Sequence, residues 1–444
     1  MSQALLQAWE ATLRRNGRRR AVVQAADGQA ASFRELDSRA AAWCETQVPD
    51  PRSLRGRAVV FAAANSLGWF EVFLGLLKAG AVAVPLDPAE PLVEQRRLAV
   101  ALRAAAWWDG GKLEALAGAR RYRDPEVSLI KLTSGTTGQP RALVFTAGQL
   151  LADARQVTAS MGIRRHDLNY ALIPLGHSYG LGNLVVPLVA HGIPLVCGTA
   201  PLPHVIAADF ARWRPTVFPG VPVLWRALAG SDLVLRGLRL AISAGAPLAP
   251  AVARDFAARF GTRIHGFYGS SETGGISFDR SGAATLTGGV GGAMRGVTLT
   301  ALGGRRLRVS SPAVLTHGNR QRSGQLGAWL MPDCVERGVH GMVTLLGRRG
   351  ASVKIAGRRV NLEEIGGRLR RLKGVREAWV GTGGGADPVL GAVVATERSV
   401  SDLRAMLQTD TAGWKIPKRW AVVSALPVTA RGKTDTRALR AMIA

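Results

Sequence analysis

The sequence contains only three cysteines in 444 residues, Cys44, Cys197 and Cys334. They are scattered, and no pair of them has the short spacing of a metal-binding motif. So few cysteines exclude a small fold held together by disulfides. We therefore expect a protein of a reducing compartment, the cytoplasm.

Acidic and aromatic residues are also scarce. The chain has 31 acidic and 58 basic residues, which gives a formal net charge of +27, and aromatic residues make up 6%. Such a charge attracts nucleic acids, anionic lipids or acidic proteins. However, the arginines are spread along the chain, and no aromatic side chains alternate with them as in a single-strand-binding motif. We expect a solvated basic surface and no specific nucleic-acid partner.

Long apolar runs are missing as well. The longest apolar stretch, residues 171–197, is interrupted by prolines, histidines and glycines, which argues against a membrane span. Glu10 and the basic run from Arg14 to Arg20 leave no room for the apolar part of a signal peptide. We expect no membrane span and no secretion signal.

What the sequence has is an alternation of strand-like and helix-like segments. Residues 2–15 and 33–46 have helical apolar spacing, and Ser32 with Glu35 forms a potential capping box. Strands are expected at 58–64 and 81–86 on either side of a helix at 69–78. This alternation predicts an α/β fold with parallel strand pairing. A further strand is expected within 172–180, where it runs into a loop with His177. Other strands are expected at 216–218, 238–243 and 263–267, and helices at 150–161 and 250–260.

The pattern changes towards the C-terminus. Residues 285–347 consist of short runs with many glycines, which suggests antiparallel β structure. A compact α+β unit follows. The length also calls for more than one domain. We expect a large domain at 1–347, a hinge at 348–350 and a small domain at 351–444.

One glycine- and hydroxyl-rich segment, Thr133-Ser134-Gly135-Thr136-Thr137-Gly138-Gln139-Pro140-Arg141, follows a strand-like run at 128–132. Glycines let the backbone approach a ligand closely, and hydroxyl and N–H groups offer several donors to one anion. The spacing differs from that of a Walker loop, which ends in Gly-Lys-Ser/Thr. The segment predicts a phosphate-binding loop; a polar linker is the alternative.

Further motifs follow in a fixed order: Ser243-Ala244-Gly245-Ala246-Pro247, Tyr268-Gly269-Ser270-Ser271-Glu272, Gly347-Arg348 and Arg431-Gly432-Lys433. Together with the phosphate loop, they resemble the motifs of the adenylate-forming (AMP-binding) superfamily, which includes acyl-CoA synthetases. The resemblance extends over nearly the whole chain. It implies a large domain of α/β layers with a distorted β-barrel subdomain, followed by a small, mobile α+β domain.

The resemblance also implies a two-step reaction with ATP, Mg²⁺ and coenzyme A, or the phosphopantetheine of a carrier protein. A carboxylate first attacks the α-phosphate of ATP to give an acyl-adenylate, and a thiol then displaces AMP. The small domain is expected to swing between the two steps.

Site residues are carried over from the family motifs by position. Thr133, Ser134, Gly135, Thr136, Thr137, Gly138 and Arg141 would hold phosphates, and Gly245, Ala246, Pro247, Tyr268 and Gly269 would flank adenine. Asp333 and Arg348 would bind the ribose, Glu272 would bind Mg²⁺, and Ser271 would reach the α-phosphate. Lys433 would neutralise the charge that develops during adenylation, and His177 would border the carboxylate pocket.

Several of these residues also have a structural alternative. Arg141 and Lys433 could be surface cations, Glu272 a helix cap, and Asp333 an ordinary loop residue. Tyr268 and His177 could be core residues with satisfied polar atoms. At the hinge, Gly350 stands where the family has Asp or Lys, although glycine can absorb a torsional change.

The substrates are less constrained by the sequence. Small and apolar residues predominate in the motifs, including Gly220 and Val221, and no Asp is placed to bind an amino group. We therefore expect a fatty or aryl acid. The acceptor is either coenzyme A or an acidic carrier protein, because a basic surface attracts both. A catalytically inactive nucleotide- or nucleic-acid-binding protein is the alternative of another class.

Overall fold

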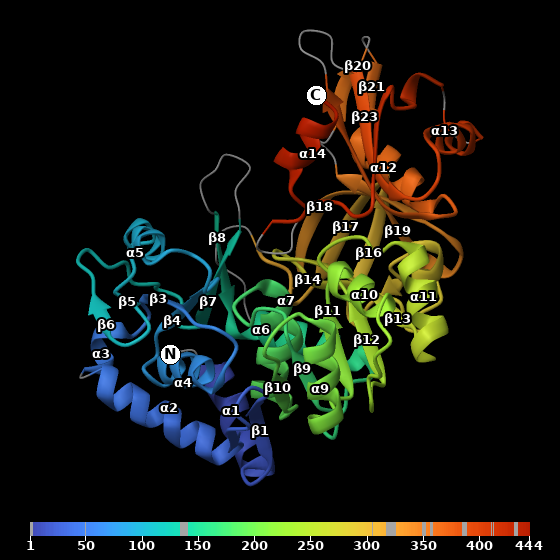
Figure 1. Cartoon of the computed structure of the whole chain (residues 1–444). Coiled ribbons are helices and arrows are strands. Elements are labelled where there is room, and N and C mark those ends of the chain that lie inside the picture. The colour runs from blue at the N-terminus through green and yellow to red at the C-terminus, as the bar shows by residue number, and fades with distance from the viewer. Residues whose placement is uncertain are drawn as a thin grey trace.

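A computed structural model of the chain describes most of its residues (Figure 1). The described residues are 3–48, 50–133, 141–303, 305–316, 326–348, 352–355, 358–383, 389–409, 411, 413–429 and 434–444. They form two large mixed sheets with helices on their faces, a four-stranded antiparallel sheet and a small C-terminal part. The α/β fold class expected from the sequence is confirmed.

The largest sheet has nine strands, and its central strands, from β13 to β1, run parallel. Antiparallel strands close both of its edges. In spatial order the strands are β15 (Gly292–Ala293), β14 (Gly274–Phe278), β13 (Ile264–Ser270), β12 (Leu240–Ser243), β11 (Val217–Gly220), β9 (Asn169–Ala171), β10 (Leu195–Cys197), β1 (Arg20–Gln24) and β2 (Ala30–Ser32).

The second sheet has six strands, and its inner strands are again parallel. Their side chains alternate between two cores: Val59 and Phe61 of β3 face one, while Ala58 and Val60 face the other. In spatial order the strands are β6 (Leu113–Ala115), β5 (Ala106–Trp108), β3 (Ala58–Ala62), β4 (Val82–Leu86), β7 (Val127–Thr133) and β8 (Arg141–Thr146).

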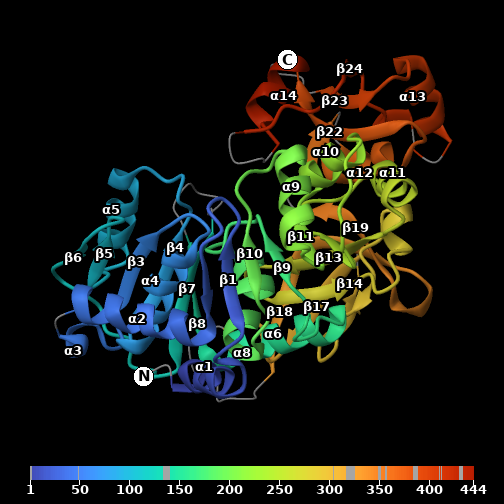
Figure 2. The same cartoon turned by 60° about the horizontal axis from the view of Figure 1, so that its bottom comes forward.

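A single apolar core joins the two sheets, which lie side by side in Figure 2. It contains side chains from both sheets and from the helices α1 (Gln3–Asn16), α2 (Phe33–Gln47), α4 (Leu67–Lys78), α6 (Ala147–Met161), the π-helical turn η1 (Leu181–Val185) and α8 (Val186–His191). Other helices cover the outer faces: α5 (Leu92–Ala101) on the six-stranded sheet, and α9 (Pro203–Trp213), α10 (Pro222–Ala229) and α11 (Pro250–Phe260) on the nine-stranded sheet. Short helices are α3 (Pro51–Leu54), α7 (Ser178–Gly180), η2 (Ala284–Thr287), η3 (Val339–Gly341) and η4 (Gly413–Lys415).

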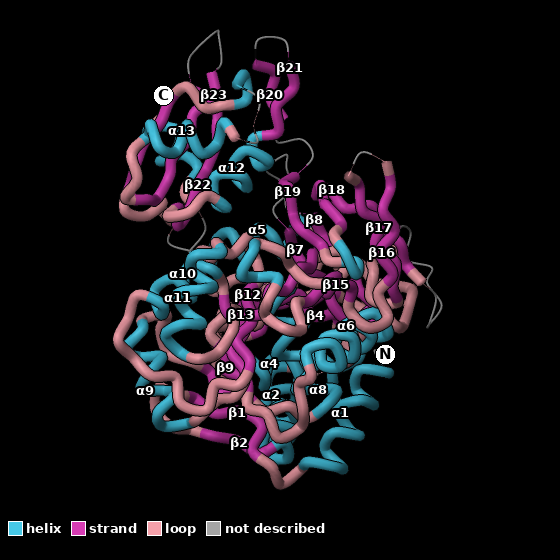
Figure 3. Tube along the Cα trace, turned by 90° about the vertical axis from the view of Figure 1, so that its right-hand side faces the viewer, coloured by secondary structure: helices cyan, strands magenta, loops and turns pink. Residues whose placement is uncertain are grey.

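The antiparallel region expected at 285–347 is a sheet of four strands, β16 (Thr298–Leu302), β17 (Arg306–Ser311), β18 (Gly327–Arg337) and β19 (Val343–Arg348). It shares a core with the nine-stranded sheet. The C-terminal part follows (Figure 3). Its elements are β20 (Ser352–Ile355), β21 (Arg358–Asn361), α12 (Leu362–Arg371), β22 (Val375–Gly383), β23 (Val389–Thr396), α13 (Val400–Gln408), β24 (Arg419–Val423) and α14 (Thr436–Met442).

The C-terminal part rests on helices of the larger part. Arg226 of α10 forms an ion pair with Glu377 of β22, and Glu377 also accepts a hydrogen bond of 3.2 Å from the backbone N–H of Leu426. We propose that the small domain begins after Gly347, with a hinge at 348–350. Residues 349–351, which include Gly350, lie outside the described residues.

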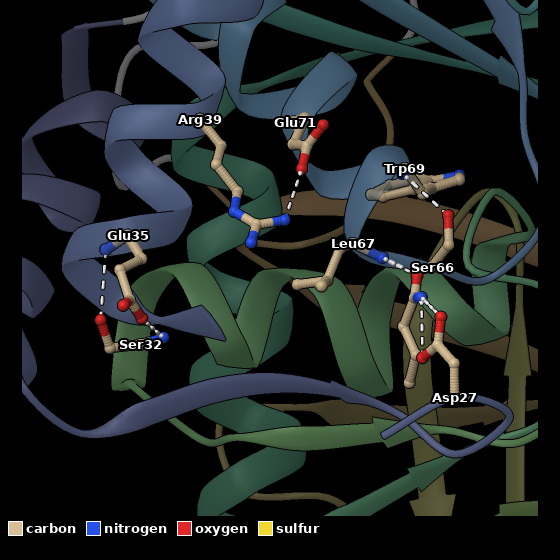
Figure 4. Close-up of polar contacts among 9 residues, drawn as sticks. Asp27, Ser32, Glu35, Arg39, Ser66, Leu67, Trp69 and Glu71 are labelled. Carbon is tan, nitrogen blue, oxygen red and sulfur yellow. Dashed lines mark hydrogen bonds and ion pairs between the residues drawn. The ribbon is translucent and has the colours of Figure 1, made fainter. Parts of the chain in front are cut away.

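Side-chain caps fix the starts of two helices in the shared core (Figure 4). Ser32 and Glu35 form the expected capping box at α2, with bonds of 3.2 and 2.7 Å. Ser66 caps α4 by accepting a bond of 3.2 Å from the N–H of Trp69. These caps satisfy N–H groups that a helix leaves unpaired at its first turn.

The strand expected at 172–180 is wrong, because β9 ends at Ala171. Beyond it, the side chain of Asn65 replaces a neighbouring strand. Its amide donates to the carbonyl oxygens of Ala171 and Ile173 at 3.1 and 2.9 Å and accepts from the N–H of Leu175 at 3.0 Å. With its backbone groups satisfied in this way, the segment turns and enters α7 instead of extending the sheet.

Two other properties of the described residues bear on the sequence expectations. The three cysteines are free, and burial raises the pKa of the Cys197 thiol to about 12. Among the helices that the structure describes, none combines the length and the apolar character needed to cross a membrane.

Two glycines of α4 provide a test of the core packing. A Cβ at Gly75 would lie 2.4 Å from Cε3 of Trp43 and 3.0 Å from the carbonyl oxygen of Ala40, both in α2. Gly75→Ala should therefore lower the free energy of unfolding by about 1–3 kcal/mol, as overpacking does. The matched variant is Gly68→Ala, because the nearest atom to its Cβ would be Ser66 Oγ at 3.7 Å. It should be neutral or stabilising by up to about 1 kcal/mol.

The measurement is urea unfolding followed by tryptophan fluorescence. Equal effects of the two substitutions would contradict the close packing of α2 on α4.

Candidate functional site

The predicted site residues lie where parallel strands of both sheets end. Thr133 ends β7, Gly245 follows β12 and Ser271 follows β13. Asp87, which was not predicted as a site residue, follows β4. The carboxyl ends of parallel strands form the usual ligand-binding edge of an α/β sheet. Both sheets therefore contribute residues to one candidate site.

The segment that contains His177 contacts both sheets at this edge. Nε2 of His177 lies 3.3 Å from Oδ2 of Asp87, which follows the six-stranded sheet. The hydroxyl of Ser178 donates a hydrogen bond of 2.9 Å to Oγ of Ser271, which follows the nine-stranded sheet. The structure thus brings His177 close to Ser271. The contact with Asp87 was missed from the sequence, where the only indication was an acidic residue directly after a predicted strand.

Tyr268, Asp333 and Arg348 also come together. The hydroxyl of Tyr268 donates a hydrogen bond of 2.6 Å to Oδ2 of Asp333. Asp333 in β18 is the register partner of Arg348 in β19. The ring of Tyr268 is 8% exposed and belongs to the core between the sheets, so the structure also supports the core role considered for it. One carboxylate is thereby oriented beside an arginine position, which suits the recognition of hydroxyl groups.

Glu272 lies in a tight turn between β13 and β14. The N–H of Leu315 donates to the carbonyl oxygen of Glu272 at 2.7 Å, and Ser270 and Thr273 share a hydroxyl hydrogen bond of 3.0 Å. The turn ends at Gly274, whose φ of +67° requires a glycine. This backbone holds the half-buried Glu272 at the sheet edge.

The donor set at this turn suits Mg²⁺ better than a structural metal. No group of three or more His, Cys, Asp or Glu side chains that could hold a metal occurs among the described residues. Mg²⁺ commonly takes one or two carboxylates and completes its shell with water and substrate phosphates. A single carboxylate on a rigid turn fits that requirement, and Glu272 would supply it.

The predicted phosphate loop lies between β7 and β8, which pair Thr133 with Arg141. The Thr133 hydroxyl donates to the carbonyl oxygen of Arg141 at 3.5 Å, and the guanidinium of Arg141 lies 5.4 Å from the ring centroid of Trp329. Both ends of the loop are thus placed at the site. Ser134, Gly135, Thr136, Thr137 and Gly138 lie outside the described residues, as does Lys433.

The segment Gly245–Ala246–Pro247, predicted to flank adenine, is exposed just beyond the end of β12. Gly245 has a φ of +86°, which turns the chain away from the strand. Gly269, also predicted to contact the nucleotide, is exposed next to Tyr268. Both backbone segments are therefore accessible to a ligand.

Two buried charges near the site were missed from the sequence. Lys131 of β7 is 4% exposed and Asp153 of α6 is 6% exposed. Burial lowers the pKa of Lys131 and raises that of Asp153. The charge of Asp153 partly restores the pKa of Lys131 by raising it, and the charge of Lys131 lowers the pKa of Asp153. The negative charge of Glu272 also raises the pKa of Lys131. The indication in the sequence was a lysine inside an otherwise apolar strand.

Comparisons with known proteins show what this chain is similar to. Residues 112–310 match the family model of AMP-binding enzymes. The chain is 27% identical over 361 residues to the 2-hydroxy-7-methoxy-5-methyl-1-naphthoate–CoA ligase of Streptomyces carzinostaticus, covering 72% of this chain and 63% of that protein. It is 28% identical over 352 residues to the benzoate–CoA ligase of Thauera aromatica, covering 69% of this chain and 64% of that protein.

A solved benzoate CoA ligase from Burkholderia xenovorans has the same fold, with a TM-score of 0.82, 20% identity and coverage of 98% of this chain and 99% of that one. The matched region of each of the two curated relatives is just under two thirds of that relative's length. Residues 112–310 are thus similar to AMP-binding enzymes, and the chain is similar to CoA ligases over about 70% of its length.

Proposed function

We propose that this protein activates a carboxylic acid with ATP and transfers the acyl group to a thiol. A carboxylate oxygen attacks the α-phosphorus of ATP, forming the acyl-adenylate and releasing pyrophosphate. The thiol sulfur then attacks the acyl carbon, the thioester forms, and AMP leaves with the electron pair of the broken C–O bond.

The observation that carries this proposal is the hydrogen bond between Tyr268 and Asp333, beside the position of Arg348. It joins two motifs that are 65 residues apart, and the family motifs assign these residues to one nucleotide. The contact of Ser178 with Ser271 supports the proposal, because it brings the predicted acid pocket next to the predicted α-phosphate position.

Each part of the site would then have a separate role. The donors of the loop from Thr133 to Gly138, with Arg141, would bind the β- and γ-phosphates. Glu272 would hold Mg²⁺, which neutralises charge on the phosphates when it is bound. His177, held against Asp87, would border the carboxylate of the acid.

Lys433 would supply the charge that the reaction itself requires. As the carboxylate joins the α-phosphate, negative charge builds on the transferring group, and a single ammonium can offset it. The small C-terminal domain would bring Lys433 to the site for adenylation and would swing away for thioester formation.

We infer that the acid is aromatic. The relatives with printed names are ligases of naphthoate, benzoate and other aromatic acids. The residues around the end of β11 are compatible with a flat apolar substrate, because Gly220 has no side chain and Val221 is aliphatic. A fatty acid is the alternative substrate. Activity with a panel of aryl acids, compared with activity on fatty acids of increasing length, distinguishes the two.

The acceptor is tested separately from the acid. Pyrophosphate exchange identifies acids that form the adenylate, and a thioester assay with coenzyme A or with a phosphopantetheinylated carrier protein identifies the thiol. The proposed function would be refuted if no acid supported AMP formation, or if neither thiol did.

Lys433→Ala tests the mechanism of adenylation. We expect the rate of acid-dependent pyrophosphate exchange to fall by about two to three orders of magnitude, because the removal of one donor to a developing charge costs this much. Displacement of AMP from a preformed acyl-adenylate by the thiol should change much less. Lys373→Ala, an exposed lysine of the same C-terminal part, is the matched control. An undiminished exchange rate for Lys433→Ala would contradict the role of Lys433.

Asp333→Asn and Tyr268→Phe test the nucleotide contact. Loss of the carboxylate charge should weaken ATP binding by about tenfold or more, whereas loss of the tyrosine hydroxyl should weaken it by less, since only the orientation of Asp333 is affected. Isothermal titration calorimetry with a non-hydrolysable ATP analogue measures both. Asp232→Asn, in a fully exposed side chain, is the control. Equal affinity of all variants would exclude Asp333 from the nucleotide site.

A further inference from the structure

Lys131 is the strongest candidate for an additional role at this site, because it is a buried cation in an apolar strand. Its ammonium lies 4.3 Å from the ring centroid of Phe145. No ion pair or hydrogen bond of this ammonium occurs among the residues that the structure describes. A buried ammonium is costly unless other charges or a ligand compensate it. The position therefore requires an electrostatic explanation.

The strand places Lys131 on the side of the candidate site. Side chains alternate along β7, and Leu129 belongs to the core between the two sheets whereas Ile130 belongs to the opposite core. Lys131 shares the face of Leu129 and lies two residues before Thr133, where the phosphate loop begins. Helix α6 contributes Ala147, Leu150 and Ala154 to the same core, so Lys131 lies on the side of β7 that packs against α6.

Asp153 is the first compensating charge. Its Oδ1 accepts a hydrogen bond of 2.9 Å from the N–H of Gly275. The carboxylate fits closely between two glycines, since a Cβ at Gly274 would lie 2.3 Å from Oδ1 and one at Gly182 would lie 2.8 Å from Oδ2. Asp153 is therefore fixed to the end of the turn that contains Glu272.

Glu272 is the second compensating charge. Asp153 and Glu272 are the two carboxylates that act on Lys131. One cation, Lys131 on β7, is thus influenced by two anions, Asp153 on α6 and Glu272 on the turn. A positive charge at Lys131 opposes the binding of a divalent cation at Glu272, and a negative charge at Asp153 favours it.

We propose that Lys131 and Asp153 are positioning residues that form a buried charge couple and set the affinity of Glu272 for Mg²⁺. The inference rests on the proposed function, because it takes Glu272 as the magnesium ligand. Before the nucleotide binds, the positive charge of Lys131 would offset the negative charge of Glu272. The turn would then not bind Mg²⁺ tightly in the absence of nucleotide.

Two substitutions of opposite sign test the couple. Lys131→Met retains much of the side-chain volume but removes the cation, so Mg²⁺ should bind more tightly and its half-saturating concentration should fall about three- to tenfold. Asp153→Asn removes the anion and should raise that concentration by a similar factor. The affinity for metal-free nucleotide should fall in Lys131→Met and rise in Asp153→Asn. In the double variant, both the magnesium dependence and the nucleotide affinity should be close to the wild-type values.

The readout is calorimetric binding of a non-hydrolysable ATP analogue at increasing Mg²⁺ concentrations, which does not depend on the acid or the thiol. Lys112→Met, an exposed lysine, is the matched control and should leave the magnesium dependence unchanged. Thermal unfolding checks that each variant is folded, and Lys131→Gln replaces Lys131→Met if the latter does not fold.

A purely structural role predicts lower thermal stability with no opposite shifts in magnesium dependence. Shifts of the same sign, or no shift, in variants that still bind nucleotide would overturn the inference and leave the proposed function intact. Failure of the wild-type protein to bind the magnesium–nucleotide complex would overturn both.

Discussion

The apolar core shared by the two parallel sheets is the constraint on which the candidate site depends. Helices α2, α4, α6 and α8 contribute to this core together with strands from both sheets. Burial of so much apolar surface is the main stabilising contribution to folding and fixes the sheets relative to each other. As a result, the carboxyl ends of β4, β7, β12 and β13 meet, and residues from distant parts of the sequence form one site.

Polar contacts then refine an arrangement that the core has fixed. The hydrogen bond between Ser178 and Ser271 and the pair of His177 with Asp87 each connect the helix entered at α7 to a different sheet. The hydrogen bond from Tyr268 to Asp333 connects the nine-stranded sheet to the antiparallel sheet. Each bond contributes little to stability by itself. Their combined effect is to fix side-chain directions at the point where three sheets meet.

Local patterns predicted much of the fold from the sequence, because their causes are local. The capping box at Ser32 and the helix of residues 250–260 follow directly from residue order. The strand expected at 172–180 is wrong because the amide of Asn65, more than 100 residues away, satisfies the backbone there. The contact of Asp87 with His177 and the burial of Lys131 likewise depend on the packing of separate elements. Motif order indicated the similarity to AMP-binding enzymes, but it could not show that Lys131 and Asp153 are buried close to the candidate site.

The ion pair between the C-terminal part and α10 has a consequence for how firmly the two are held together. It joins Arg226 and Glu377, whose side chains are 24% and 18% exposed, so water and salt reach both partners. An ion pair of this kind contributes about 0–1 kcal/mol, and dissolved ions screen it. Breaking this one ion pair therefore costs little free energy, and added salt lowers that cost further.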